Sequence, residues 1–157
     1  MGIRRWLLAA AGALALALVL GFAYLSSLQL FASDPVSQTG SGAIDGYDPV
    51  AYFRYGRAVT GDPRHTHAWN GAIWRFASEE NRAAFAAEPE RYAPAFGGYC
   101  AFAVANGYTA KSDPAVFAIV DGRLYLNFDR ATQEKWEAER DVMIENGRRG
   151  WPGVIED

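Results

Sequence analysis

The chain is short of the residues on which most metal, redox and phosphate chemistry depends. Its 157 residues include one cysteine and two histidines. A single cysteine excludes both an intramolecular disulfide framework and a pair of cysteines around a metal ion. The sequence also has no glycine-rich phosphate loop, no G-x-S-x-G nucleophile motif and no H-E-x-x-H zinc motif. Any histidine or cysteine chemistry must therefore use these three side chains.

The charge balance excludes a further class of function. Residues 34–157 carry 13 basic against 18 acidic side chains, a net charge of −5, and no run of Lys or Arg. Proteins that bind nucleic acid neutralise its phosphates with basic patches, so we expect no nucleic-acid partner. Aromatic residues make up 14 % of the chain, which is too many for a disordered protein. The counts predict a small, acidic, aromatic-rich globular domain.

Residues 1–32 predict a membrane segment. An apolar run from Trp6 to Phe31 would rise about 39 Å as a helix, more than the ~30 Å that a bilayer core needs. Arg4 and Arg5 precede the run, and the positive-inside rule then places the rest of the chain in the bacterial periplasm. We expect a single-pass inner-membrane anchor. The alternative is a cleaved signal peptide, which would release the domain into the periplasm.

The rest of the chain predicts one domain. Residues 33–43 are rich in Ser, Gly and Pro and predict a flexible tether. We assign residues 44–152 to the domain and residues 153–157 to a tail. Short hairpins and helices follow one another along the domain without a repeat or a second domain, and we expect the α+β class.

Residues 65–76 predict a β-hairpin. Asn70-Gly71 is a two-residue type I′ turn, because both residues tolerate a positive φ. Such a turn predicts three facing pairs: Trp69 with Ala72, His67 with Trp74, and His65 with Phe76. All six side chains would share one face, which we expect to be the buried one because it is rich in large aromatics.

Capping residues and turns predict the remaining elements. They are a helix from Ser78 through Phe85, a second hairpin of residues 116–120 and 123–128, and a last helix from Asp129 through about Asn146, ended by Gly147.

The candidate site residues are Cys100, His65 and His67. The two histidines stand two residues apart on one strand, about 6.6 Å apart and facing the same way, so both could reach one metal ion. Cys100 follows Gly97-Gly98, where two glycines allow a close approach of the backbone. A thiolate with imidazoles suits Cu(I) or Zn(II).

Other interpretations of these residues stay open. The histidines could be hydrogen-bonded structural side chains, and Cys100 a buried small hydrophobe. A nucleophilic pair of Cys100 with a histidine is also chemically feasible.

Several strings of the chain resemble a known family. They are GYDPVAYF at 46–53, WNGAIWRFASEEN at 69–81, GGYCA at 97–101 and DGRLYLN at 121–127. Together they resemble the YHS domain family, in its exported, membrane-anchored bacterial branch, over roughly residues 44–152. The resemblance implies a small α+β, treble-clef-related fold and metal binding, since YHS domains occur in copper-transporting ATPases and heavy-metal proteins.

The chain departs from the metal-binding members of that family. Where they carry cysteines, this sequence has Ala51, Ala77 and Asn81. A metal, copper above all or zinc, would therefore have to use Cys100, His65 and His67. These observations favour a membrane-anchored periplasmic copper chaperone or sensor that is not an enzyme.

Two alternatives remain for the function. The first is a non-catalytic interaction module that has lost the family's metal site. It would present an aromatic face, including Trp69, Trp74 and Tyr99, to a membrane-protein partner. The second is an enzyme with Cys100 as nucleophile, which requires a reactive thiol in an electropositive pocket.

Overall fold

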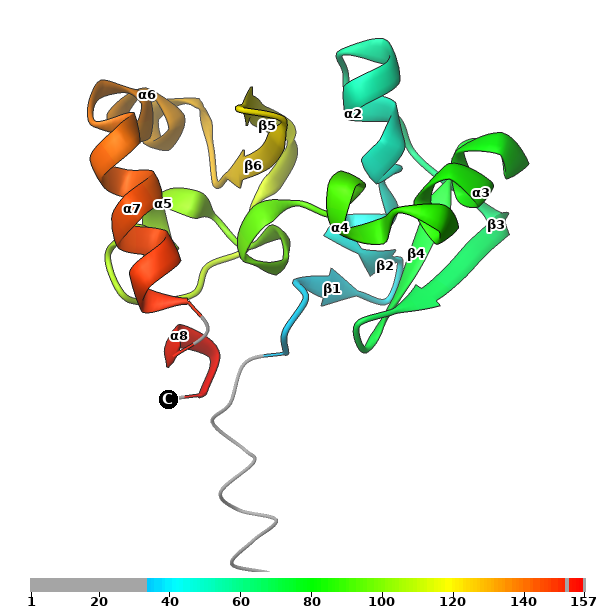
Figure 1. The fold of residues 1–157 in the computed structure, drawn as a ribbon, viewed down its shortest axis with the longest axis horizontal. Coiled ribbons are helices and arrows are strands. Elements are labelled where there is room, and N and C mark those ends of the chain that lie inside the picture. The colour runs from blue at the N-terminus through cyan, green and yellow to red at the C-terminus, as the bar shows by residue number, and fades with distance from the viewer. Residues whose placement is uncertain (1–33, 152, 157) are drawn as a thin grey trace, which may run out of the picture. The chain divides into compact units, whose positions relative to one another are not determined.

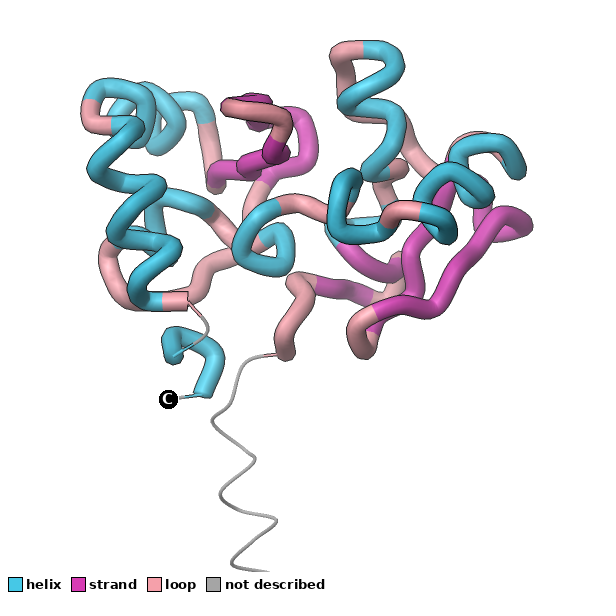
Figure 2. The backbone as a smooth tube through the Cα atoms, viewed as in Figure 1, coloured by secondary structure: helices cyan, strands magenta, loops and turns pink. Residues whose placement is uncertain are grey.

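The computed structural model describes residues 34–151 and 153–156, which form a mixed α+β domain of short antiparallel hairpins and helices (Figures 1 and 2). Residues Ser33–Glu156 group as one compact unit by their contacts. The expected membrane segment of residues 1–32 lies outside the described residues. Within the described ranges, no helix combines the length and the apolar character needed to cross a bilayer.

The elements divide into two successive groups. The first comprises β1 (Gln38–Thr39), β2 (Gly42–Ala43), the 3-10 helix η1 (Ile44–Gly46), α2 (Pro49–Tyr55), β3 (Asp62–Trp69), β4 (Ala72–Phe76), α3 (Glu79–Ala87) and α4 (Pro89–Tyr92). The second comprises the 3-10 helix η2 (Ala95–Gly98), α5 (Ala101–Ala105), β5 (Asp113–Val120), β6 (Arg123–Asn127), α6 (Arg130–Ala138), α7 (Arg140–Gly150) and α8 (Gly153–Glu156). The strands form three two-stranded antiparallel sheets, β1–β2, β3–β4 and β5–β6.

The β3–β4 hairpin confirms the predicted turn. Asn70 has φ +49° and Gly71 has φ +75°, as a type I′ turn requires. The structure also confirms two of the predicted pairs, Trp69 with Ala72 and His67 with Trp74.

The third predicted pair of this hairpin is wrong. Phe76 pairs with Asp62 rather than with His65, because the register shifts between Asp62 and Thr66. Such an irregularity leaves extra residues of one strand without a partner on the other. His65 therefore lies outside the regular pairing of β3 with β4.

The structure differs from the flexible tether expected for residues 33–43, because residues 36–43 are folded against the domain. Val36 is 1 % exposed and packs in the core, while β1 and β2 form their own hairpin. The backbone N–H of Ser37 donates to the Gly97 carbonyl at 2.9 Å, and that of Ile44 donates to the Ser37 carbonyl at 2.9 Å. The distant partner Gly97, together with the local bond to Ile44, orders a segment whose composition alone favours a coil.

A buried carboxylate joins the first group of elements. Asp48 is fully buried and caps α2, accepting from the backbone N–H of Val50 at 2.8 Å and of Ala51 at 3.3 Å. Its other oxygen accepts from the backbone N–H of Ala77 at 2.8 Å and from Nδ2 of buried Asn81 at 2.6 Å. The side chain thus connects the start of α2 to the end of β4 and to α3.

Two hydrophobic clusters form the core, and β6 takes part in both. The first core contains Val36, Ala43, Ile44, Val50, Tyr52, Ala72, Trp74, Phe76, Phe85, Ala93, Leu124 and Leu126. The second core contains Ala95, Phe96, Ala101, Val104, Tyr125, Trp136 and Ile144. Because successive side chains of a strand point to opposite faces, β6 buries Leu124 and Leu126 in one core and Tyr125 in the other.

The C-terminal helices correct three predictions. The single helix expected from Asp129 is two helices, α6 and α7, separated at Glu139, whose φ of −128° and ψ of 34° are not helical. Gly147 does not end a helix but lies inside α7, where a Cβ atom would come within 2.5 Å of the Phe96 ring. Residues 153–156 of the expected tail form a short helix, α8. The N-cap at Asp129 is confirmed, since its side chain accepts from the backbone N–H of Thr132 at 2.7 Å.

Buried Tyr52 predicts sensitivity to alkaline pH. Its hydroxyl donates to the Pro114 carbonyl at 2.8 Å. Burial raises the pKa of Tyr52 well above its ordinary value, and Tyr47, Asp113 and Asp48 raise it further. A folded-state pKa above the unfolded one contributes stability that is complete below about pH 10 and is lost as the pH rises further.

We therefore expect the free energy of unfolding to fall above about pH 10, and to fall less steeply in Tyr52→Phe. Chemical denaturation across this pH range measures the slope. Tyr55→Phe is the control, because Tyr55 is 51 % exposed. An unchanged slope in Tyr52→Phe would contradict the assignment.

Candidate functional site

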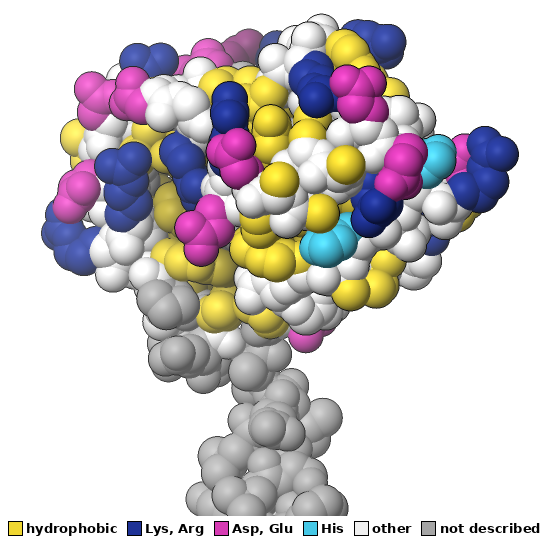
Figure 3. All heavy atoms as spheres, turned by 45° about the vertical axis from the view of Figure 1, so that its right-hand side comes forward, with side chains coloured by type: hydrophobic (Ala, Val, Ile, Leu, Met, Phe, Trp, Pro, Cys, Tyr) yellow, Lys and Arg dark blue, Asp and Glu magenta, His cyan; other side chains and the backbone are white. Residues whose placement is uncertain are grey.

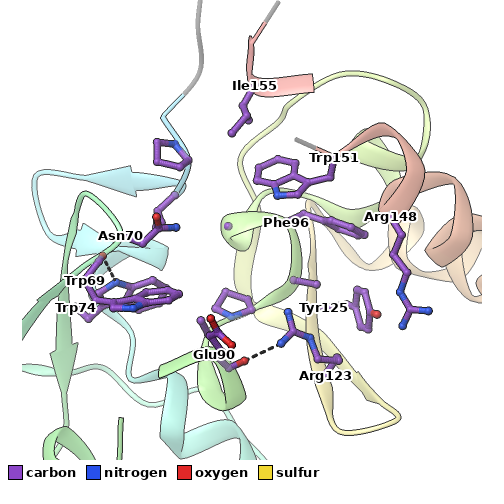
Figure 4. Close-up of a pocket in the computed structure, with 16 residues that line it drawn as sticks. Trp69, Asn70, Trp74, Glu90, Phe96, Arg123, Tyr125, Arg148, Trp151 and Ile155 are labelled. Atoms are coloured by element: carbon purple, nitrogen blue, oxygen red, sulfur yellow. Dashed lines mark hydrogen bonds between the residues drawn. The ribbon is translucent and has the colours of Figure 1, made fainter. Parts of the chain in front are cut away.

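A cavity of 510 Å³ opens between side chains of both groups of elements (Figure 4). It is lined by Pro35, Val36, Trp69, Asn70, Trp74, Glu90, Ala93, Pro94, Ala95, Phe96, Gly97, Arg123, Tyr125, Arg148, Trp151 and Ile155. We call this cavity the aromatic cleft. Its size lies in the range of about 300–1,000 Å³ that is typical of small-molecule sites.

The β3–β4 turn supplies one wall of the aromatic cleft. Trp69 is the last residue of β3, and Trp74 faces the same way from β4 because the turn sets the register. The indole Nε1 of Trp74 donates to the Trp69 carbonyl at 3.0 Å, and the two ring centroids are 6.0 Å apart. Trp74 is fully buried and Trp69 half-buried, so the Trp69 ring is the accessible part of this wall.

Phe96 and Trp151 form the opposite wall (Figure 4). Their ring centroids are 6.0 Å apart, and the ring centroids of Tyr99 and Trp151 are also 6.0 Å apart. The backbone N–H of Trp151 donates to the Gly147 carbonyl at 2.9 Å, which holds the indole at the end of α7. Gly147 has no side chain, so the Phe96 ring can lie against α7.

The N-terminal segment adds Pro35 and Val36 to the lining. This segment reaches the cleft because Gly97, with φ +59°, has no side chain, so the backbone of Pro35 can lie directly against it. A side chain at position 97 would collide with the Pro35 carbonyl oxygen. The predicted close approach at the two glycines is therefore confirmed, and its partner at Gly97 is the segment expected to be a tether.

Three charged side chains border the cleft: Arg123, Arg148 and Glu90. Arg123 shares a face of β6 with Tyr125, two residues on, and its Nη1 donates to the Glu90 backbone carbonyl at 2.7 Å. Arg148 is exposed and makes no ion pair or hydrogen bond with any other residue of 34–151. Figure 3 shows hydrophobic side chains gathered at the centre of one face, with basic and acidic ones around them.

Cys100 lies away from this lining. It is 1 % exposed and lies directly before α5. Its backbone pairs with that of Leu126 of β6 in an isolated parallel β-bridge. Its Sγ donates to Oδ1 of buried Asn127 at 3.7 Å, and the same oxygen accepts from the Phe102 backbone N–H at 3.1 Å. Because Oδ1 accepts this N–H, Asn127 Nδ2 is buried without a hydrogen-bond partner among the residues that the structure describes.

The two histidines lie on β3, and each has its own partner. His67 packs its ring edge-on against Phe85, at 6.0 Å between centroids. His65 Nδ1 lies 3.4 Å from Glu79 Oε2 at the start of α3. A hydrogen bond from Arg82, with a smaller contribution from His65, holds the pKa of the Glu79 carboxyl below its ordinary value. Both histidine side chains reach the surface (Figure 3).

The structure does not bring Cys100, His65 and His67 into one site. Within residues 34–151 and 153–156, no three His, Cys, Asp or Glu side chains are placed to hold a metal ion together. The thiol contacts Asn127, whereas the histidines contact Phe85 and Glu79.

This separation predicts how metal binding responds to mutation. We expect Cys100→Ser to leave any affinity for Zn(II) or Cu(I) unchanged, because the thiol and the imidazoles have different surroundings. A titration of both metals against a competing chelator, on the wild type, Cys100→Ser and a His65/His67 double alanine variant, measures this. A loss of affinity in both variants would contradict the arrangement.

Comparison with known proteins gives no information on the function of this chain. Protein-family models, curated proteins and solved structures were compared with the chain, and none matches. The resemblance to YHS domains therefore stays a prediction.

The aromatic cleft is the feature that the sequence analysis missed. The hairpin pattern places Trp69 and Trp74 on one aromatic face, but no sequence pattern indicates the opposite wall. Arg148 and Trp151 lie more than 70 residues further along the chain, so only the fold brings them to that face.

Proposed function

We propose that this chain is an exported, non-catalytic binding protein that takes up a small apolar molecule in the aromatic cleft. This proposal develops the interaction-module alternative, with a small molecule in place of a protein surface as the bound species. It retains the YHS-like fold and the periplasmic, membrane-anchored location as expectations from the sequence.

The observation that carries the proposal is the pair of opposed aromatic walls. Trp69 and Trp151 each leave part of the indole accessible on a cavity of 510 Å³. Small-molecule sites combine such apolar walls with a few polar groups that fix orientation. Aromatic pairs add about 0.5–1.5 kcal/mol beyond area burial, which favours a ligand that contains a ring.

The chemistry of the lining supports binding rather than catalysis. Among the described residues that line the cleft, none is a cysteine, histidine, serine or lysine. The lining thus offers rings, aliphatic groups, one amide and three charged groups, which suit recognition of an unreacted molecule.

A neutral aromatic amide tests the proposal. The full chain is placed in nanodiscs of zwitterionic phosphatidylcholine and titrated with naphthalene-2-carboxamide by calorimetry, with empty nanodiscs as the reference. We expect saturable 1:1 binding that Trp69→Leu and Trp151→Leu each weaken about tenfold, the effect of roughly 1.4 kcal/mol of lost ring contact.

Ile73→Ala is the matched control. Ile73 lies on the same hairpin but is 48 % exposed and outside the lining. Its affinity should equal that of the wild type. Absence of saturable binding, or an equal loss in Ile73→Ala, would overturn the proposal.

A further inference from the structure

We infer that the aromatic cleft selects a ligand with an anionic group, a carboxylate in the simplest case, attached to its ring-bearing apolar body. This inference rests on the proposed function, because it names the ligand class of the same cleft. The juxtaposition that carries it is two arginines beside accessible indole rings.

Arg148 is the first part of the argument. Arg148 is one of the lining residues of the cleft, and no carboxylate of residues 34–151 pairs with its guanidinium. Its neighbour Arg149, by contrast, lies 3.6 Å from Glu145 one turn earlier in α7. An arginine left unpaired at the border of an apolar cavity is a donor available to a planar anion.

Arg123 is the second part. Its Nη1 donates to the backbone carbonyl of Glu90, which fixes the guanidinium in position. The acceptor of this bond is a neutral carbonyl and not a carboxylate, so the bond does not neutralise the positive charge of Arg123. A guanidinium has five N–H donors, and one such bond leaves others for a ligand. Figure 4 shows Arg123 and Arg148 both on the Tyr125 side of the cleft.

The charge balance of the lining favours an anion over a cation. Among the lining residues that the structure describes, two are arginines and one is an acid, Glu90, whereas residues 34–157 as a whole carry a net charge of −5. The cleft is therefore a locally positive place on an acidic domain. Glu90 opposes the binding of an anion, and its removal should strengthen that binding.

The experiment compares naphthalene-2-carboxylate with the neutral naphthalene-2-carboxamide, which differs only in the charged group. Both are titrated by calorimetry against the full chain in phosphatidylcholine nanodiscs. We expect the carboxylate to bind at least about fivefold more tightly, in the range of a partly screened charge pair. Raising the salt from about 0.15 M to about 1 M shortens the Debye length from ~8 Å to ~3 Å and should remove most of this preference.

Three variants locate the preference. Arg148→Gln should lower the affinity for the carboxylate by roughly threefold to tenfold and leave that for the carboxamide unchanged. Arg149→Gln, the matched control on the same helix, should change neither. Glu90→Gln should raise the affinity for the carboxylate and leave the carboxamide unaffected.

The outcomes separate the two proposals. If neither compound binds, the proposed function fails. If the carboxamide binds and the carboxylate binds no more tightly, the inference of an anionic ligand is overturned while the proposed function stands. A carboxylate preference that is equally strong in Arg148→Gln and Arg149→Gln also overturns the inference.

Discussion

Asp48→Ala is expected to lower the free energy of unfolding by about 3–5 kcal/mol, the largest loss that we predict for a polar residue of this domain. The Asp48 carboxylate is fully buried and accepts from three backbone N–H groups and from Asn81 Nδ2. Removing an N-cap costs about 0.5–2 kcal/mol. Each buried donor left without an acceptor adds about 1–3 kcal/mol.

Urea denaturation of the purified full chain measures this loss. Asp129→Ala is the matched control, because Asp129 also caps a helix but is exposed and holds one backbone N–H of α6. We expect a far smaller loss in that variant. Similar losses in the two variants would show that the buried connections of Asp48 to Ala77 and Asn81 contribute nothing.

Gly97→Ala is expected to cost about 3 kcal/mol and to weaken ligand binding in the aromatic cleft. The φ of +59° at Gly97 strains any L-residue by about 1–2 kcal/mol. The added Cβ would also collide with the Pro35 carbonyl oxygen, and relief of such overpacking typically costs about 1–3 kcal/mol. The segment that must move carries Pro35 and Val36, which line the cleft.

Gly56→Ala isolates the second contribution. Gly56 has a similar φ of +63°, but a Cβ atom there would have nothing within 4 Å. This variant should show the loss from backbone strain alone and bind naphthalene-2-carboxamide as the wild type does. Equal effects in Gly56→Ala and Gly97→Ala on stability and on binding would contradict the close packing of the N-terminal segment on Gly97.

Local chemistry explains which parts of the fold could be predicted. The type I′ turn at Asn70-Gly71 and the caps at Ser78 and Asp129 depend on residues within a few positions of each other. The separation of α6 from α7 at Glu139 has no proline or glycine to mark it, so a continuous helix was the natural expectation. The register shift between Asp62 and Thr66 does have a local signal, because Pro63 has no backbone N–H for the ladder, but the pairing prediction did not use it.

Long-range contacts explain what could not be predicted. The hairpin β1–β2 is ordered by partners such as Gly97, some 60 residues away, which composition cannot reveal. The aromatic cleft has the same origin, because Trp69 and Trp151 become neighbours of one cavity only after both cores have formed. The three predicted metal ligands do not come together for the same reason. Their spacing in the sequence places His65 and His67 on one strand but does not predict where Cys100 lies.

Fluorine NMR of the full chain labelled with 5-fluorotryptophan tests the central claim most directly, because it reports on each wall of the cleft separately. The chain has five tryptophans, whose signals can be assigned with single Trp→Phe variants. On titration with naphthalene-2-carboxamide, we expect the Trp69 and Trp151 signals to shift together along one saturation curve. The Trp136 signal should stay in place, because its ring is buried in the second core outside the lining. If the Trp69 and Trp151 signals do not move, or if they move no more than Trp136, the aromatic cleft is not a binding site.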